Sequence, residues 1–402
     1  MEKQKCPELR FNGFFEVWNI KKLSDLGSIQ TGSTPSTSDE SYYSKTGLMW
    51  VTPTDINGQL ILNTDKKLSI LGRKKARVVP PNTILVTCIA SIGKNALLLE
   101  EGSFNQQINS LTPFERNDPY FLLSQSYFWS NVMQQFAAKG TMQIVNKTQF
   151  SNIETFVPSR LEQSSIGNFF QNLDQSIALH EKKLTQTQNF KKAMLEKMFP
   201  KQGTQRPEIR LKGFSRNWKI EAIGDVLKEV FRPINLDNQT KYRLVTVKRR
   251  NGGIAERAIL KGKDILVKSQ FEVKAGDYII SKRQVVHGAT GLVPPELDGS
   301  VVSNEYLIGQ GTDQLNIEFF ALLSTLPEMY QKFFLSSYGV DIEKLFFDVN
   351  DWKKREVLLP SLEEQVRISS FFKQVDETLK LQKQQLQTLK NLKQALLEKM
   401  FV

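Results

Sequence analysis

The chain repeats itself, and this repeat constrains the fold more than any other feature of the sequence. Residues 7–26, PELRFNGFFEVWNIKKLSDL, return at 207–226 as PEIRLKGFSRNWKIEAIGDV, with eight identical residues at a constant offset of 200. Residues 157–200 align without a gap to 359–402 at an offset of 202, and both copies contain LEKMF. Chance similarity between lysine-rich helices does not explain ungapped proline and aromatic matches, so the sequence indicates a tandem duplication.

The segments between the repeats, 27–156 and 227–358, show little resemblance to each other. Both contain short runs of β-branched and aromatic residues bounded by Gly, Pro and Asn, which are typical of strands. These runs are LMWV, TILVTCIA and NALLLE in the first segment, and YRLVTV, DYIIS and VVSNEYLIG in the second. Each segment also predicts one helix, over 118–138 and 317–334. We therefore expect a mixed α/β globule in each half.

A long helix is predicted after each globule. Each follows a proline and begins with a capping box, Ser159-x-x-Glu162 and Ser361-x-x-Glu364. Apolar residues then recur at alternating three- and four-residue spacing, which is the seam of a coiled coil. The expected seam consists of Phe170, Leu173, Ile177, His180, Leu184, Thr187, Lys191, Met194 and Met198, and of Phe372, Val375, Leu379, Gln382, Leu386, Leu389, Lys393, Leu396 and Met400.

Two matched seams favour pairing of the helices with each other over packing of each on its own globule. Because the repeat implies a pseudo-two-fold axis, the pair should be antiparallel, with His180 facing Gln382. The expected order is a first globular domain over 1–157, a helix over 158–200, a second domain over 201–359 and a helix over 360–402. The predicted fold class is mixed α/β, with two globules joined by an antiparallel coiled coil.

The charge of the chain narrows the class of partner. Its 402 residues carry 54 Lys and Arg against 42 Asp and Glu, a formal charge of +12 with a pI near 9.4. Such an excess favours a polyanion, with nucleic acid first, although ribosomal and membrane-surface proteins are basic too. Two cysteines and two histidines leave no ligand set for structural zinc and fit a reducing cytosol. We expect no secretory signal and no membrane span.

Apparent catalytic motifs have simpler explanations. Gly27–Thr34 resembles a phosphate loop but has Ser33 in place of the lysine, so we interpret it as a glycine-rich loop. Asn117-Asp118-Pro119-Tyr120 resembles the amine-binding loop of methyltransferases, yet Asp118 as N-cap before Pro119 explains it. Gly309–Gly311 is interpreted as a turn, and Cys88 as inert core. A scattered carboxylate nuclease site stays open, because Asp and Glu are common and such sites are short.

Several segments together resemble the specificity subunit of type I restriction–modification systems. They are WVTPTDI (50–56), SIGK (91–94) with FNQQIN (104–109), PSLEEQ (360–365) and LEKMF, in the order given by the repeats. The resemblance covers essentially the whole chain. The second domain departs from it, because KRQVVHGATGLVPPELDGSVVSNEY (282–306) replaces the SIGK and FNQQIN pattern.

This resemblance implies a protein that is not an enzyme by itself. Each globule would be a target recognition domain that reads one half of a bipartite, asymmetric site in double-stranded DNA. The helices would dock two methyltransferase subunits, and motor-nuclease subunits would join through the complex. S-adenosylmethionine, ATP and magnesium are expected in those partners, no cofactor or metal in this chain, and a cytoplasmic location.

Reading DNA in the major groove requires Arg, Lys, Asn and Gln on loops that reach base edges, with other cations on phosphates. The candidates are Lys45, Thr54, Asp55, Ser91, Lys94, Gln106, Lys139, Thr141 and Lys147 in the first domain, and Lys248, Arg249, Arg250, Asn251, Lys282, Arg283, Gln284 and His287 in the second. For any one of them solvated surface is the simpler interpretation, whereas the sets together favour DNA. Two other functions stay open: a self-contained methyltransferase or nuclease with a cryptic site, and a basic coiled-coil scaffold without sequence preference.

Overall fold

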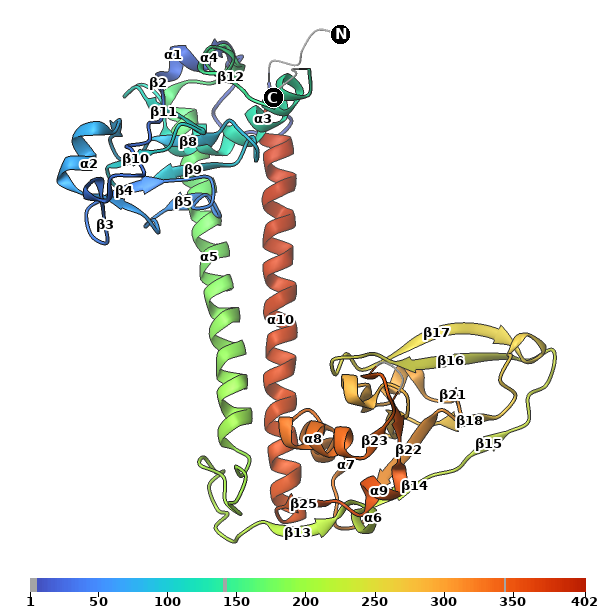
Figure 1. Ribbon diagram of the computed structural model, residues 1–402. Helices are drawn as coiled ribbons and strands as arrows, with labels where there is room; N and C mark the ends of the chain where they lie inside the picture. The colour runs from blue at the N-terminus through green and yellow to red at the C-terminus, as the bar shows by residue number, and fades with distance from the viewer. Residues whose placement is uncertain (1–5, 140–142, 343–344) are drawn as a thin grey trace. The chain divides into compact units, whose positions relative to one another are not determined.

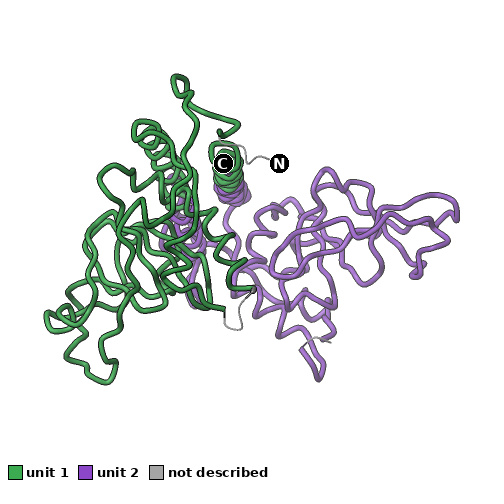
Figure 2. The backbone as a smooth tube through the Cα atoms, turned by 90° about the horizontal axis from the view of Figure 1, so that it is seen from above, with its two compact units in different colours: residues 1–183, 382–402 green, residues 184–381 purple. Residues whose placement is uncertain are grey.

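The computed structural model describes residues 6–139, 143–342 and 345–402. They form two compact units (Figure 2): unit 1 contains residues 1–183 with 382–402, and unit 2 contains 184–381. The long helices α5 (Arg160–Lys197) and α10 (Leu362–Met400) have nearly the expected bounds. Both are divided between the units, so that each unit holds one globule, the start of one long helix and the end of the other.

Unit 1 is built on two five-stranded sheets and a two-stranded ribbon. The ribbon pairs β1 (Asn19–Lys22) with β12 (Glu154–Val157). One sheet has the order β2 (Gly27–Thr31), β11 (Ile108–Pro113), β8 (Ile84–Thr87), β9 (Asn95–Leu98), β5 (Leu60–Ile61). The other has the order β3 (Tyr43–Ser44), β6 (Lys67–Leu68), β4 (Leu48–Val51), β10 (Gly102–Phe104), β7 (Val78–Val79). The helices are α1 (Leu23–Leu26), α2 (Ile70–Lys75), α3 (Pro119–Lys139) and α4 (Lys147–Ser151).

Unit 2 repeats this plan. Its ribbon pairs β13 (Lys219–Ala222) with β25 (Glu356–Leu359). One sheet has the order β14 (Leu227–Glu229), β22 (Tyr306–Gly311), β19 (Tyr278–Ser281), β20 (Thr290–Leu292). The other has the order β15 (Pro233–Ile234), β18 (Gln270–Val273), β21 (Ser300–Ser303), β16 (Lys241–Val247), β17 (Ile254–Lys261), and β23 (Ser337–Tyr338) pairs with β24 (Phe346–Phe347). The helices are α6 (Ile223–Val226), α7 (Ile317–Leu323), α8 (Pro327–Leu335) and α9 (Val349–Lys353), with the 3-10 turn η3 (Val285–His287).

The two globules share a topology that their sequences conceal. The strand order β2-β11-β8-β9 in unit 1 corresponds to β14-β22-β19-β20 in unit 2. In each globule a ribbon strand, β1 or β13, precedes this sheet in sequence, and a helix, α3 or α7, follows its last strand. Strand order depends on short buried runs such as ILVT in β8 and YIIS in β19, which tolerate exchange of one β-branched or aromatic residue for another. The duplication therefore includes the globules.

Four local predictions need correction. The helix expected over 317–334 is two helices, because Pro327 cannot donate a backbone hydrogen bond and instead opens α8. The run VVSNEYLIG is two strands, β21 and β22, separated by a turn. The supposed loop at Gly27 is strand β2, and the supposed turn at Gly309–Gly311 is the end of β22. Glycine is needed at Gly27, where an added Cβ would lie 2.3 Å from the carbonyl oxygen of Thr112.

The repeated segments, 7–26 with 157–200 and 207–226 with 359–402, which we call the frame, make the same ion pair twice. Arg10 donates to both carboxylate oxygens of Glu162 at 2.8 and 2.7 Å, and Arg210 donates to Glu364 at the same two distances. Both carboxylates are buried, with side chains 2% and 1% exposed. The predicted capping boxes are therefore half right: the serine hydroxyls accept from the glutamate amides at 3.4 Å, whereas the carboxylates bind the frame arginines.

An aromatic cluster fixes the end of a long helix in each unit. In unit 1, Phe401 packs on Trp18, Phe121 and Phe170, with ring centroids 5.4 to 6.1 Å apart. In unit 2, Phe199 packs on Trp218, Phe319 and Phe372 at 5.8 to 6.3 Å. Each LEKMF motif thus places its phenylalanine in the core of a globule, and Figure 1 shows the end of α10 beside the start of α5 in unit 1.

The segments of α5 and α10 in each unit run antiparallel. In unit 1, Asp174 pairs with Lys393 and Glu181 with Lys390, both at 2.6 Å. In unit 2, Lys191 pairs with Asp376 at 2.5 Å. All eighteen predicted seam positions are buried or half-buried. His180 has Nδ1 2.9 Å from the carbonyl oxygen of Ser176, as expected for a hydrogen-bonded seam residue, and its contact with Gln382 stays a prediction.

Candidate nucleic-acid interface

In unit 1, four connecting segments meet at one edge of the sheets. The amide of Asn105, in the β10–β11 turn, donates to Val51 at the end of β4 (2.9 Å). Cys88, which opens the β8–β9 loop, donates to Gln107 (2.7 Å) and accepts from Val145 (3.0 Å). The segments 52–58, 88–94, 105–107 and 143–147 therefore lie together, and we call them the first loop cluster.

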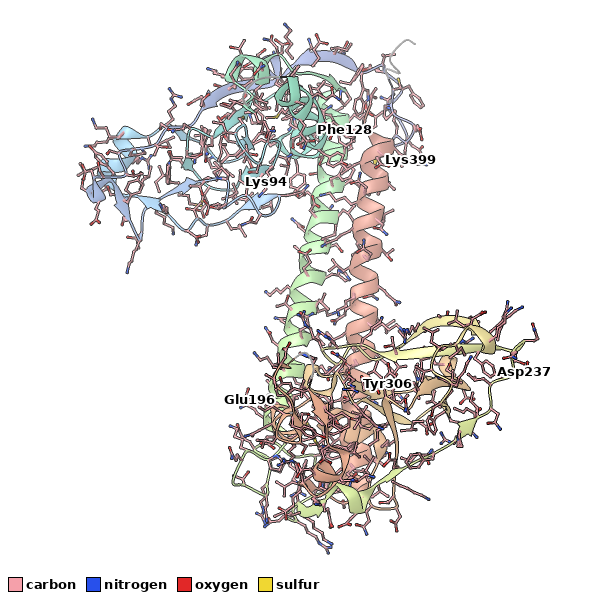
Figure 3. All side chains as sticks on the ribbon, turned by 45° about the vertical axis from the view of Figure 1, so that its right-hand side comes forward. Lys94, Phe128, Glu196, Asp237, Tyr306 and Lys399 are labelled. Atoms are coloured by element: carbon pink, nitrogen blue, oxygen red, sulfur yellow. The ribbon has the colours of Figure 1, made fainter. Side chains whose placement is uncertain are left out.

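Most candidates of the first domain belong to this cluster. Lys94, Gln106, Lys147 and Thr54 are exposed on it, and Figure 3 labels Lys94. Ser91 is half-buried, and its carbonyl accepts from the Thr87 hydroxyl. Lys94 also lines a hollow between the β8–β9 loop, residues 56–58 and α3. The hollow is lined mainly by amide and hydroxyl side chains: Asn57, Asn95, Tyr127, Ser130, Asn131 and Gln134.

The remaining candidates of the first domain are placed differently. Asp55 accepts from the amide and the hydroxyl of Thr52 at 2.8 and 2.6 Å, so it holds a turn and offers little to a ligand. Lys45 precedes β4 while Thr54 follows it, so the strand separates them and Lys45 is outside the cluster. Thr141 lies outside the described residues, as does the side chain of Lys139.

In unit 2, the structure brings the two predicted basic segments together. The turn between β16 and β17 contains Lys248–Asn251, and the β19–β20 loop contains Lys282–His287. Arg250 donates its amide to the carbonyl of His287 at 2.7 Å, and Asn251 donates to Gly288 at 2.9 Å. We call these two segments, with the β21–β22 turn, the second loop cluster.

Two cations of the second loop cluster are already bound within the protein. Arg283 pairs with Glu305 at 2.8 Å, and its guanidinium lies over the Phe346 ring, 5.4 Å from the centroid. Lys282 donates to the carbonyl of Asn304 at 2.9 Å. Gln284 is half-buried, and its amide oxygen has no hydrogen-bond partner within the described part of the chain. Arg283 and Lys282 thus join the β19–β20 loop to the β21–β22 turn.

The two clusters occupy equivalent places. The SIGK segment lies in the β8–β9 loop, and KRQVVHG lies in the corresponding β19–β20 loop. The FNQQIN segment forms the β10–β11 turn, and SNEY forms the corresponding β21–β22 turn. The second domain therefore lacks the sequence pattern of the first while keeping its position in the fold.

Some polar residues of the clusters were not selected from the sequence. Asn57, Asn131 and Gln134 were missed because they lie on a neutral turn and a helix face, where charge gives no signal. Glu305 was missed because a search for cations ignores their carboxylate partners.

Groups of three or more His, Cys, Asp or Glu able to hold a metal ion do not occur among residues 6–139, 143–342 and 345–402. Across the same ranges no helix is long and apolar enough to cross a membrane. Burial raises the pKa of the Cys88 thiol to about 12, in keeping with its interpretation as core.

Comparison with known proteins identifies relatives of this chain by sequence. The chain is 33% identical over 149 residues to the Type I restriction enzyme HindI specificity subunit of Haemophilus influenzae, which covers 36% of this chain and 32% of that protein. It is 25% identical over 227 residues to the MjaIX specificity subunit of Methanocaldococcus jannaschii, covering 52% of each. The matched stretches thus span a third to a half of these relatives.

Solved structures share the fold at low identity. The S subunit of a type I restriction–modification system from M. genitalium superimposes with a TM-score of 0.63 over 99% of both chains, at 13% identity. A chain from a structure concerned with complex assembly and conformational transition of the type I R-M system gives 0.53 at 17% identity, covering 96% of this chain and 98% of that one.

A family model described as the type I restriction modification DNA specificity domain matches the chain twice, over residues 16–189 and 215–391. Each match includes one globule with one loop cluster. The chain belongs to the specificity-subunit family of type I restriction–modification systems and carries two specificity domains.

Proposed function

We propose that the chain is the non-catalytic DNA-recognition subunit of a type I restriction–modification complex, in which each globule reads one half of a bipartite site. The observation that carries this proposal is the pair of loop clusters at equivalent places on two globules of one topology. The description of the matched family as a DNA specificity domain supports it, as does the net charge of +12.

The two half-sites should differ in sequence. The first loop cluster presents Lys94, Gln106 and the amides of the adjoining hollow, whereas the second presents Lys248, Arg250 and Gln284. Hydrogen-bond donors and acceptors in different order select different base edges in the major groove. An asymmetric target follows from this difference between clusters.

The long helices are proposed to form a continuous antiparallel coiled coil that separates the domains. The ion pairs Asp174–Lys393 and Lys191–Asp376 support this, because shifting both residues of one pair by the repeat offset of 202 gives the other pair. A duplicated helix pair presents the same surface twice, which suits two copies of one partner. We propose that two methyltransferase subunits dock there, with motor-nuclease subunits joining through the complex.

The chemistry of the complex is assigned to those partners. S-adenosylmethionine would be held by the methyltransferase subunits, and ATP with magnesium by the motor-nuclease subunits. Such a complex would act on cellular DNA in the cytoplasm.

Methylome sequencing of a host that expresses the chain with its methyltransferase partner tests the proposal. Methylated adenines in two short specific half-sites, separated by a spacer of fixed length and variable sequence, are expected. A single uninterrupted motif, or methylation without sequence preference, would contradict it.

Two experiments on the purified chain test the alternatives. Methyl transfer from S-adenosylmethionine to DNA without any partner would identify a self-contained enzyme. A nuclease footprint that does not change with DNA sequence would identify a non-specific scaffold. The proposal predicts neither result.

A further inference from the structure

The turn between β16 and β17 contains two consecutive non-glycine residues in the left-handed conformation. Arg250 has φ 58° and Asn251 has φ 54°, although Gly252 and Gly253 follow directly. Residues with a Cβ avoid this region, arginine more than asparagine. Strained residues persist where the surrounding structure holds them and tend to gather at functional sites. A glycine would adopt this conformation without strain, so the chain carries an arginine here at a conformational cost.

The backbone of this turn is fixed from outside. The amides of Arg250 and Asn251 donate to the carbonyls of His287 and Gly288, on the β19–β20 loop. The approach is close: a Cβ added to Gly288, which has φ 70°, would lie 3.0 Å from the side-chain oxygen of Asn251. The main chain of Arg250 is thus held by a second loop, so its side chain starts from a defined point.

The guanidinium of Arg250 has its donors available. Its side chain is exposed, and within the described residues no hydrogen bond or ion pair engages it. Its neighbours differ, since Arg283 pairs with Glu305 and Lys282 with the carbonyl of Asn304. A side chain with a fixed base and five free N–H groups is arranged to meet a ligand with paired acceptors.

We propose that Arg250 is a specificity-determining residue that reads one guanine of the half-site bound by unit 2. This deepens the proposed function and rests on it. A two-stranded β-ribbon fits the major groove, where guanine presents O6 and N7 as two adjacent acceptors. Lys248, exposed on the same turn, would contact a phosphate and hold the β16–β17 hairpin in register.

The test compares methylomes of the complex carrying the wild-type chain, Arg250→Ala, Arg250→Lys and a control, Lys263→Ala. Lys263 is an exposed cation beyond β17, at the opposite end of the β16–β17 hairpin from Arg250. Lysine keeps the charge and loses the fork, so Arg250→Lys separates a bidentate base contact from a phosphate contact. If Arg250→Ala does not fold, the Arg250→Lys variant alone still tests the base contact.

The expected result is the same for Arg250→Ala and Arg250→Lys. Discrimination at one G·C position of one half-site falls by about 5- to 150-fold, while the other positions and the other half-site are retained. Lys263→Ala keeps the wild-type motif. Two results overturn the proposal. One is an even loss of methylation at all sites in Arg250→Ala that is absent in Arg250→Lys, and the other is an unchanged motif in both variants. Failure of the proposed function is distinct from this, because the wild-type chain would then show no bipartite motif.

Discussion

At the scale of single residues, the frame depends on two buried carboxylates. Glu162 and Glu364 lie at the start of the long helices and are held by Arg10 and Arg210 of the repeated PELRF and PEIRL segments. Each pair joins the beginning of a domain to the residues that follow it more than 150 positions later in sequence. The sequence showed that these residues repeat, but the partner of each was hidden because a capping box explained the glutamates locally.

Removal of one partner should therefore be costly. Arg10→Ala leaves the Glu162 carboxylate buried without a cation, which should lower the free energy of unfolding of unit 1 by about 3–5 kcal/mol. Urea denaturation followed by tryptophan fluorescence measures this. Lys197→Ala, which removes a partner of the half-exposed Glu208, is the control and should cost less than about 1 kcal/mol. Equal losses of unfolding free energy in the two variants would show that the buried ion pair stabilises the fold no more than the exposed one.

Cys88 offers a second measurement at this scale. Burial raises its pKa to about 12, so at pH 8 its thiolate fraction is on the order of 10⁻⁴. Iodoacetamide should leave Cys88 unmodified in the folded chain and modify it after denaturation, as read by peptide mass spectrometry. Rapid modification of Cys88 in the native chain would mean that strand β8 opens and that this edge of the sheet is not core.

At the scale of elements, local sequence rules predicted where helices begin, but not where a helix is interrupted or where a strand ends. Asp118 caps α3 by accepting from the amides of Tyr120 and Phe121 at 3.0 Å, as the Asp-Pro sequence indicates. The break before Pro327 was missed because the apolar pattern continues across it. The continuation of β22 to Gly311 was missed because a pair of glycines is typical of turns, whereas here Gly309 makes room for Leu227. Tertiary packing overrides local preference at such positions.

The helix pair allows a prediction about DNA spacing. Four residues inserted after Gln188 in α5, matched by four after Thr378 in α10, should keep the pairs Lys191–Asp376 and Asp174–Lys393 while lengthening both helices by about 6 Å. The unread spacer of the methylation motif should then grow by one or two base pairs, each about 3.4 Å. The half-sites should stay the same. An unchanged spacer in the methylome of this variant would show that helix length does not set it.

At the scale of the whole molecule, the repeat makes the two chain ends equivalent to an internal loop. Leu9 donates its amide to Lys399, and Ile209 donates to Lys197, both at 2.9 Å. Residues 201–206, which join the second pair, are exposed. The order of domains could be predicted from the offsets alone, whereas the shared topology of the globules could not, because their sequences have diverged.

A circular permutant tests this equivalence. Joining Val402 to Met1 and opening the chain between Gln202 and Gly203 should give a soluble protein with the thermal unfolding midpoint of the parent within a few degrees. Opening within β8, at Leu85, is the control and should prevent folding because that strand is fully buried. Aggregation of the first permutant, with the parent soluble, would contradict the equivalence of the two chain ends with the loop at residues 201–206.

A domain exchange followed by methylome sequencing tests most directly the proposal that each globule reads its own half of the target. Residues 27–153 would be replaced by the matching segment of another specificity subunit, which keeps the β1–β12 ribbon and both long helices intact. The reciprocal exchange of residues 227–355 is the matched control. Each exchange should replace one half-site and leave the other half-site and the spacer as they were; a change in both half-sites from either exchange would contradict the claim.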